Sequence, residues 1–205
     1  MKSTAAIAFA CLAGVEARRE RWYATCKLEA NPALEDPSFV SGLIKLKQYE
    51  GGLLRIASII GGLCPDGESS CDSQNHGFHV HSAEYDGENC GSSGGHFNPT
   101  GVDHAVWYNT KDKRHTGDLK MLSARENGLA FYGTYDRMAS LDSTSDNYVV
   151  GKAIVIHAGV DDLGKGGDAG SIASGNAGPR IACCNITSVT KKEWRSESFF
   201  DYVDI

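Results

Sequence analysis

The segment HGFHVH, residues 76–81, alternates histidine with apolar residues and decides the predicted fold. A period of two is typical of a half-buried antiparallel β-strand, because successive side chains point to opposite faces. Phe78 and Val80 are expected to face the core. His79 and His81 then share the other face, about 7 Å apart along the strand. Two imidazoles on one face can both coordinate one transition metal ion.

Strand signals continue on both sides of this segment. They cover Trp22–Leu28, Val40–Tyr49, Leu53–Ile60, Leu119–Leu122, Leu129–Arg137, Tyr148–His157 and Ile181–Val189. Asn127-Gly128 predicts a tight hairpin between two of these strands. No segment keeps a helical period over three turns. The predicted fold is all-β, with about eight antiparallel strands in a sandwich or barrel.

Two long glycine-rich segments interrupt the strands, at Ser82–Arg114 and Ala158–Gly178. Loops of this length inside a compact domain are usually functional or disordered. The segment Lys191–Ile205 follows the last predicted strand and matches no strand pattern. It is expected to be disordered or to dock on a partner through its aromatic residues Trp194, Phe199, Phe200 and Tyr202.

The chain has 205 residues and a formal net charge of −6. This length predicts one domain, and the negative charge argues against a nucleic-acid partner. Residues 1–17 combine Lys2, a short apolar stretch and a small-x-small cleavage site, which predicts a secretory signal peptide. The apolar stretch is too short to span a bilayer, so no membrane insertion is expected. A membrane anchor and a transit peptide are the alternatives. The mature domain is predicted at 18–190, with a tail at 191–205.

Cysteine usage agrees with secretion. The chain has seven cysteines, and Cys11 would leave with the signal peptide. An even number after a signal peptide indicates disulfides in an oxidising, extracellular compartment. The remaining six, Cys26, Cys64, Cys71, Cys90, Cys183 and Cys184, allow 15 pairings, among which the sequence alone does not choose.

Four more histidines are candidates to bind metal together with the pair on the strand. His96, His104 and His115 lie in or border the first long loop, and His157 ends an apolar strand. Asp118 follows His115 by three residues. Imidazole suits copper and zinc, and an added carboxylate suits zinc. A single histidine on a strand is more often a surface or core residue, and His76 is interpreted in this way, as a structural hydrogen bonder.

The ordered set of motifs resembles the copper/zinc superoxide dismutase family in its extracellular form. The motifs are HGFHVH (76–81), GGHFNP (94–99), RHTGDL (114–119), VIHAGVDDLGKGGD (155–168) and SGNAGPRIAC (174–183). The resemblance runs from about Trp22 to Val189. It implies a Greek-key barrel of eight antiparallel strands with two long functional loops.

The resemblance also implies a role for each site residue. Copper, cycling between Cu(II) and Cu(I), would bind His79, His81, His96 and His157. Zinc, as Zn(II), would bind His96, His104, His115 and Asp118. His96 would bridge the two metals and deliver a proton, so that it counts as catalytic together with Arg180, which would hold a small anion beside copper. Asp161 would link His79 to His104 and orient both rings.

The implied reaction is dismutation of superoxide to oxygen and hydrogen peroxide by an extracellular antioxidant enzyme. The second loop carries neutral residues, Ala169, Gly170 and Ala173, where charged side chains are common in the family, and Pro179 precedes Arg180. These departures favour a weaker guiding field for the anion. They also support an alternative, a secreted metal-binding carrier with little catalytic activity. A copper chaperone, which would need a second domain with Cys-x-x-Cys, is a third interpretation.

The resemblance places Cys90 and Cys183 where the family closes its intrachain disulfide. Cys64 and Cys71 flank the insert PDGESS, and a local bridge between them is predicted. Cys26 and Cys184 then remain, on the first and last strands, which neighbour each other in this fold. The alternative leaves Cys26 as a buried free thiol.

Two further departures concern the surface. Asn185-Ile186-Thr187 is a glycosylation sequon, which predicts a glycan on Asn185. Asn185 and Ser188 also stand where the family has apolar contacts between subunits, so the usual homodimer is expected to be weakened or replaced.

The spacing from His104 to His115 is two residues longer than usual in the family, and the residues between them are AVWYNTKDKR.

Overall fold

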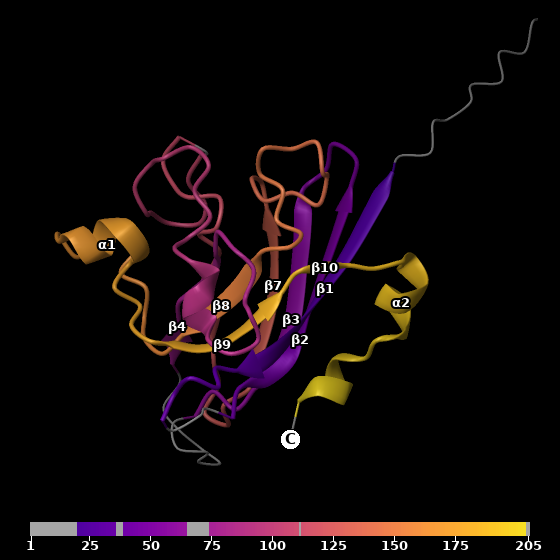
Figure 1. Ribbon diagram of the computed structural model, residues 1–205, viewed down its shortest axis with the longest axis horizontal. Helices are drawn as coiled ribbons and strands as arrows, with labels where there is room; N and C mark the ends of the chain where they lie inside the picture. Colours follow the sequence, from indigo (N-terminus) through magenta and orange to yellow (C-terminus); the bar gives the residue numbers. More distant parts are fainter. Residues whose placement is uncertain (1–19, 36–38, 65–73, 111, 204–205) are drawn as a thin grey trace, which may run out of the picture.

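A computed structural model describes residues 20–35, 39–64, 74–110 and 112–203, and its regular structure is mostly antiparallel β (Figure 1). The strands are β1 Arg21–Ala30, β2 Ser41–Tyr49, β3 Leu54–Gly61, β4 Asn75–His76, β5 Phe78–Val80, β6 Leu122–Ser123, β7 Ala130–Asp136, β8 Ala153–His157, β9 Arg180–Asn185 and β10 Thr187–Ser188. The helices are short: η2 Cys90–Ser93, α1 Ala169–Ser174, α2 Lys191–Ser196 and η3 Phe199–Tyr202. The predicted all-β class is confirmed.

One eight-stranded sheet contains most strands, in the order β5-β8-β9-β1-β2-β3-β7, and β10 also pairs with β1. Strand β1 joins the two halves of this sheet. Its residue Ala24 pairs with Ser188 of β10, whereas Glu29 pairs with Cys183 of β9. The sheet therefore curls around a core, as a flattened barrel requires.

The core forms because each strand turns alternate apolar side chains inward. Phe78 and Val80 of β5 are buried there, as the alternation predicted, and the ring of Phe78 packs 4.9 Å from that of Tyr132 on β7. Full burial of one such side chain stabilises the fold by about 1.5–3 kcal/mol. A disulfide between Cys26 and Cys184 lies within the same core and joins β1 to β9.

Several strands are shorter than the sequence predicted. Of Leu119–Leu122 only Leu122 lies in a strand, and Tyr148–His157 forms a strand only from Ala153. The residues before Ala153 make turns instead, because the amide of Lys152 donates to the carbonyl of Val149 (3.1 Å). The predicted strand Ile181–Val189 divides at Ile186, whose backbone bonds to the residues around Gly151.

The hairpin predicted at Asn127-Gly128 was half right. The turn forms, with Gly128 at φ +69° and a bond from the amide of Arg125 to the carbonyl of Leu129 (2.9 Å). The strands on either side of the turn have other partners, since β6 pairs with β4 and β7 pairs with β3.

The segment Lys191–Val203 folds back onto its own sheet, on the opposite side of the molecule from α1 (Figure 1). The ring of Trp194 lies 5.5 Å from that of Tyr23, and Lys45 donates from Nζ to the carbonyl of Glu197 (2.9 Å). Helix α2 begins with a capping box between Thr190 and Glu193, and this helix was not predicted from the sequence. Contrary to the expectation, this segment is ordered and packs on the chain itself. Within the described residues, no helix is long and apolar enough to cross a membrane.

Candidate metal centre

Backbone hydrogen bonds join β5 to the first long loop and to the residues that follow it. These bonds bring the predicted ligands close together. The amide of Phe97 donates to the carbonyl of Val80 (2.8 Å), and the amide of Val80 donates to the carbonyl of Gly117 (2.9 Å). A Cβ atom at Gly117 would lie 2.1 Å from the carbonyl oxygen of Val80, so only glycine allows this approach. His96, His115 and Asp118 are thereby held against the strand that carries His79 and His81.

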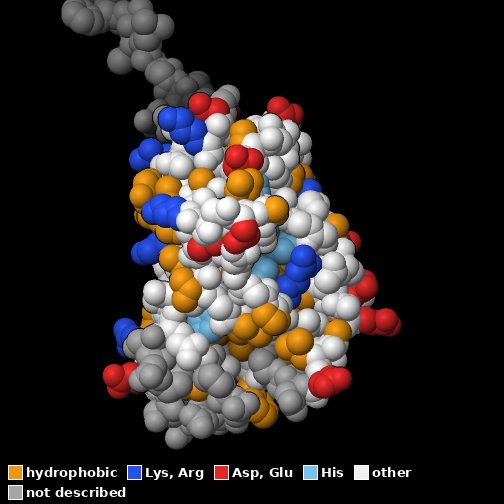
Figure 2. All heavy atoms as spheres, turned by 90° about the vertical axis from the view of Figure 1, so that its left-hand side faces the viewer, with side chains coloured by type: hydrophobic (Ala, Val, Ile, Leu, Met, Phe, Trp, Pro, Cys, Tyr) orange, Lys and Arg blue, Asp and Glu red, His pale blue; other side chains and the backbone are white. Residues whose placement is uncertain are grey.

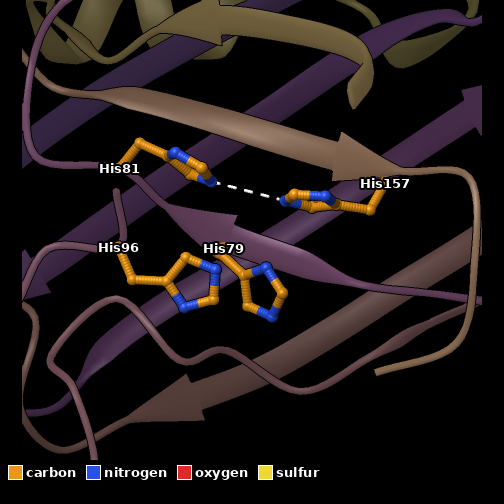
Figure 3. Close-up of side chains that lie close together, drawn as sticks. All are labelled: His79, His81, His96 and His157. Atoms are coloured by element: carbon orange, nitrogen blue, oxygen red, sulfur yellow. Dashed lines mark hydrogen bonds between the residues drawn. The ribbon is translucent and has the colours of Figure 1, made fainter. Parts of the chain in front are cut away.

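His157 reaches the same place from the neighbouring strand. Strand β8 pairs with β5, with Val155 opposite His79, and the register of β8 with β9 on its other side shifts between Ile156 and His157. Figure 3 shows the rings of His79, His81, His96 and His157 turned toward one another. One ligand nitrogen from each of these four buried residues lies within 4.8 Å of the others.

The hydrogen bonds of His81 and His157 show which ring nitrogens are free. Nδ1 of His81 faces the carbonyl of Gly94 (2.8 Å), and Nδ1 of His157 faces the carbonyl of Gly178 (2.9 Å). A carbonyl oxygen only accepts, so each Nδ1 carries the proton of a neutral ring and each Nε2 is left with a lone pair. These two Nε2 atoms lie 3.4 Å apart, joined by the dashed line in Figure 3. A cation bound by both atoms would satisfy two lone pairs at this distance.

The other two rings of this cluster point their free nitrogens to the same region. Nδ1 of His79 and Nε2 of His96 are buried and have no hydrogen-bond partner among the described residues. Burial lowers the pKa of His79 to about 3 and that of His157 to about 4, so both rings are neutral near pH 7. Neutral, buried and unpartnered imidazoles are the state in which histidine binds copper or zinc.

A second cluster surrounds the carboxylate of Asp118. Its Oδ1 accepts from Nδ1 of His96 (2.9 Å) and Nδ1 of His104 (2.8 Å), and Nδ1 of His115 lies 3.2 Å away. Burial raises the pKa of Asp118, but hydrogen bonds from the three imidazoles outweigh it and hold this pKa well below its usual value. Three imidazoles and one carboxylate within 4.8 Å form a donor set that suits zinc, and His96 belongs to both clusters.

Asp161 connects the two clusters on the far side of their rings. Its Oδ2 accepts from Nε2 of His79 (2.9 Å), and its Oδ1 accepts from Nε2 of His104 (2.7 Å). Burial opposes protonation of His104, but the carboxylates of Asp118 and Asp161 outweigh it and raise the pKa of His104 to about 9. A Cβ at Gly175, which has φ +70°, would lie 1.9 Å from Oδ1 of Asp161, so this carboxylate also depends on a glycine.

Arg180 is the first residue of β9 and pairs with His157 of β8. Its side chain forms hydrogen bonds to the first long loop. Its guanidinium donates to the carbonyls of Cys90 (2.8 Å) and Gly94 (2.6 Å). The Gly94 carbonyl also accepts from His81, so one oxygen atom joins Arg180 to the first cluster. The disulfide between Cys90 and Cys183 fastens the same loop to β9.

A cavity of 470 Å³ adjoins the two clusters. His96 and His115 lie on one side of it, and Ala169, Ile172 and Ala173 of the α1 region lie on the other. Figure 2, viewed from the side of α1, shows histidine atoms in a hollow of the surface beside Lys/Arg atoms. No lysine or arginine of the described segments is part of the lining of this cavity, and Arg180 lies instead beside His81, through the shared carbonyl of Gly94.

The remaining predicted residues lie away from the metal clusters. His76 is buried and donates from Nδ1 to the carbonyl of His157 (2.9 Å), as a structural hydrogen bonder does. The side-chain amide of Asn185 binds the backbone of Tyr85. Its Oδ1 accepts from the N–H of Tyr85 (2.7 Å), and its Nδ2 donates to the carbonyl of Tyr85 (2.8 Å). Residues 1–17 and Cys71, the predicted partner of Cys64, lie outside the described residues.

Arg114 is fully buried, a role that was not predicted from the sequence. Its Nη1 donates to the carbonyls of His115 (3.0 Å) and Asp118 (2.9 Å). The signal was present in the motif RHTGDL, where a charged residue directly precedes a predicted ligand.

Comparison with known proteins agrees with this geometry. The model of the family described as copper/zinc superoxide dismutase (SODC) matches residues 40–186. A superoxide dismutase (Cu-Zn) of Paramecium bursaria Chlorella virus 1 is 40% identical over 162 residues, which cover 79% of this chain and 79% of the relative. A superoxide dismutase (Cu-Zn) of Yarrowia lipolytica (strain CLIB 122 / E 150) is 40% identical over 157 residues, which cover 76% of this chain and 95% of the relative.

Proposed function

Because this chain belongs to the copper/zinc superoxide dismutase family, we propose that it removes superoxide outside the cell as an extracellular antioxidant enzyme. One observation carries the proposal. Four buried imidazole nitrogens converge within 4.8 Å, and one of their rings, His96, also belongs to a second cluster with a carboxylate. Copper and zinc are the cofactors that fit these two donor sets.

Each cluster would hold one ion. Copper would be bound by His79, His81, His96 and His157, and zinc by His96, His104, His115 and Asp118. When bound, copper supplies a reversible one-electron change between Cu(II) and Cu(I), by which one superoxide is oxidised to oxygen and another is reduced, with uptake of two protons, to hydrogen peroxide. Zinc has no redox chemistry, so its contribution would be to fix the loop and the ring of His96.

The residues of the chain would hold the substrate and the proton. Superoxide is a small anion, and the guanidinium of Arg180 beside His81 offers a fixed positive charge. Nε2 of His96 is the atom at which a proton would be held and delivered, since Nδ1 of the same ring is held by Asp118. Asp161 would keep His79 and His104 in orientation through their outer nitrogens.

Two kinds of observation support secretion. The disulfides Cys26–Cys184 and Cys90–Cys183 are bonds that persist in oxidising compartments. Residues 1–17 have the pattern of a signal peptide. The support for a glycan on Asn185 is its sequon alone. Polar Asn185 and Ser188 support a weakened or replaced homodimer, which a two-chain mass in gel filtration with contacts through Asn185 would refute.

The deciding experiment measures metal content and superoxide consumption on the same sample. The protein secreted by a eukaryotic host is purified without added metal, and copper and zinc per chain are determined before and after copper is supplied. We expect about one copper and one zinc per chain and activity that rises with copper content. The variant His157→Ala should lose both copper and activity, whereas Lys192→Ala, on exposed α2, should keep both. A protein that binds both metals and stays inactive would instead be the carrier.

A further inference from the structure

A second hollow lies where the first long loop meets β7, and it shares no residue with the metal clusters. It has a cavity volume of 420 Å³, within the range of about 300–1,000 Å³ that is typical of small-molecule sites. The loop side is formed by Trp107 and Tyr108, within the stretch AVWYNTKDKR that lengthens the spacing between His104 and His115. The sheet side is formed by Gly133 and Tyr135 of β7.

Aromatic rings form the walls of this groove. The rings of Trp107 and Tyr108 lie 5.7 Å apart at 82°. The side chains of Tyr108 and Tyr135 are 64% and 58% exposed, and Leu53 beside them is 49% exposed. A folded chain rarely leaves several large apolar side chains together in water unless they contact something. Their ring faces suit a flat ligand that can stack.

Gly133 forms the floor. It lies on the exposed face of β7 between Phe131 and Tyr135, and a Cβ atom at this position would have no heavy atom within 4 Å. Glycine weakens a strand interior, and it often marks a place where a ligand approaches the backbone closely. The space that a side chain would occupy at this position is therefore part of the groove.

The rim is cationic. Lys120 and Arg137 line the groove and are exposed, and no ion pair found within the described residues uses either of them. The one acidic residue of the lining, Asp136, is buried and paired with Arg114 (2.6 Å). Two cations that form no ion pair with any described residue lie beside aromatic walls, in a chain of net charge −6, and they complement an anion.

We propose that this groove binds a small aromatic carboxylate. The flat ring would lie over Gly133 against Tyr135 and Trp107, and the carboxylate would contact Lys120 and Arg137. A neutral sugar would leave the two cations unused. A polyanion would need more than two basic side chains along its length. The proposal is independent of the metal centre and of the superoxide reaction.

The test uses the full-length, metal-loaded protein and 2-naphthoate as the probe. Calorimetry is expected to show one site per chain. The NMR signal of the Trp107 indole N–H, identified with Trp107→Phe, should shift, and those of Trp22 and Trp194 should not. The uncharged analogue 2-naphthamide should bind at least about fivefold more weakly, because it cannot pair with the cations.

Variants separate the groove from general surface binding. Gly133→Val places a side chain in the floor of the groove. Because valine favours a strand, Tm should stay the same or rise. The side chain fills the space for the probe, so 2-naphthoate binding should weaken at least about tenfold. Lys120→Gln and Arg137→Gln should each weaken 2-naphthoate binding about threefold or more. Arg125 is an exposed arginine that lies over Phe131, outside the groove, and Arg125→Gln should leave the binding unchanged. Absence of binding at millimolar probe overturns the proposal. So does binding that Gly133→Val leaves unchanged, or equal affinity for the amide.

Discussion

Arg114 and Asp136 form a buried ion pair, with Nη2 2.6 Å from Oδ2, that joins the loop carrying His115 and Asp118 to strand β7. The other oxygen of Asp136 accepts from the amides of Met138 (2.8 Å) and Ala139 (2.7 Å). Since Nη1 of Arg114 holds the carbonyls of His115 and Asp118, the position of two proposed zinc ligands depends on this pair.

Replacing Arg114 by methionine should therefore cost both stability and zinc. The change leaves the Asp136 carboxylate buried without its partner, which destabilises a fold by about 3–5 kcal/mol. Urea unfolding of the metal-free protein measures this loss, and zinc titration with a competing chelator measures the affinity. Lys113→Met, at the exposed neighbouring residue, is the control and should change neither. An Arg114→Met protein with wild-type stability and zinc affinity would show that the ion pair positions nothing.

Asp161→Asn should weaken metal binding without unfolding the chain. The asparagine amide can accept at only one atom, so His79 and His104 can no longer both donate to the same group. Loss of such an outer partner typically lowers metal affinity about 10–100-fold. The measurement is competitive titration of zinc and copper. Asp162→Asn removes a neighbouring carboxylate that accepts from Ser171 and Asn176 but from no histidine, and should keep affinity close to wild type.

The metal-free protein should lose stability between pH 6.5 and pH 4.5. Burial holds the pKa of His79 at about 3 and that of His157 at about 4 in the folded chain, whereas an unfolded histidine has a pKa of about 6.5. In this window the unfolded state binds more protons, so the free energy of unfolding falls as pH falls. For two such groups the slope approaches about 3 kcal/mol per pH unit.

Burial also lowers the pKa of His76, His81 and His96, so these rings add to the same loss of stability as the pH falls. His104 and Asp161 act outside that pH window. His104, with its pKa raised to about 9, is protonated in both states below pH 6.5, so its contribution is lost only as pH rises through 9. Asp161 has a lowered pKa, and its contribution is lost only under more acidic conditions. Urea midpoints at pH 7.5, 6.5, 5.5 and 4.5 make the measurement, and His157→Gln should reduce the slope. A midpoint that stays constant over this range would contradict neutral buried imidazoles.

Ala173→Lys should increase the rate at which superoxide reaches the site. Ala173 lines the cavity beside His96, and no lysine or arginine of the described residues belongs to that lining. A positive charge there should raise kcat/KM several-fold at low salt and make its decrease with ionic strength steeper. Ala173→Gln controls for side-chain size and should behave like the wild type. Equal rates for the lysine and glutamine variants would mean that the field at this position does not guide the anion.

The sequence predicted most of what depends on local alternation and spacing. Phe78 and Val80 face the core, and His79 and His81, which alternate with them, face the loop, because a strand period of two permits little else. The motif RHTGDL placed His115 and Asp118 three residues apart, close enough for both to reach one cluster. These features follow from a few neighbouring residues.

Features that depend on distant partners were missed. The buried role of Arg114 depends on Asp136, which is 22 residues away. The fold of Lys191–Val203 depends on Tyr23, Lys27 and Lys45, which no pattern within the segment reveals. The strand predicted from Tyr148 failed for the same reason, since its first residues bond to Ser140 and to each other rather than to a strand.

The central claim is that two metal ions share the ring of His96, and anomalous diffraction from crystals of the metal-loaded protein tests it most directly. Data at the copper and zinc absorption edges distinguish the two elements. We expect one copper peak among His79, His81 and His157, one zinc peak among His104, His115 and Asp118, and the ring of His96 between them. A single peak, or two peaks of which only one contacts His96, would contradict the account.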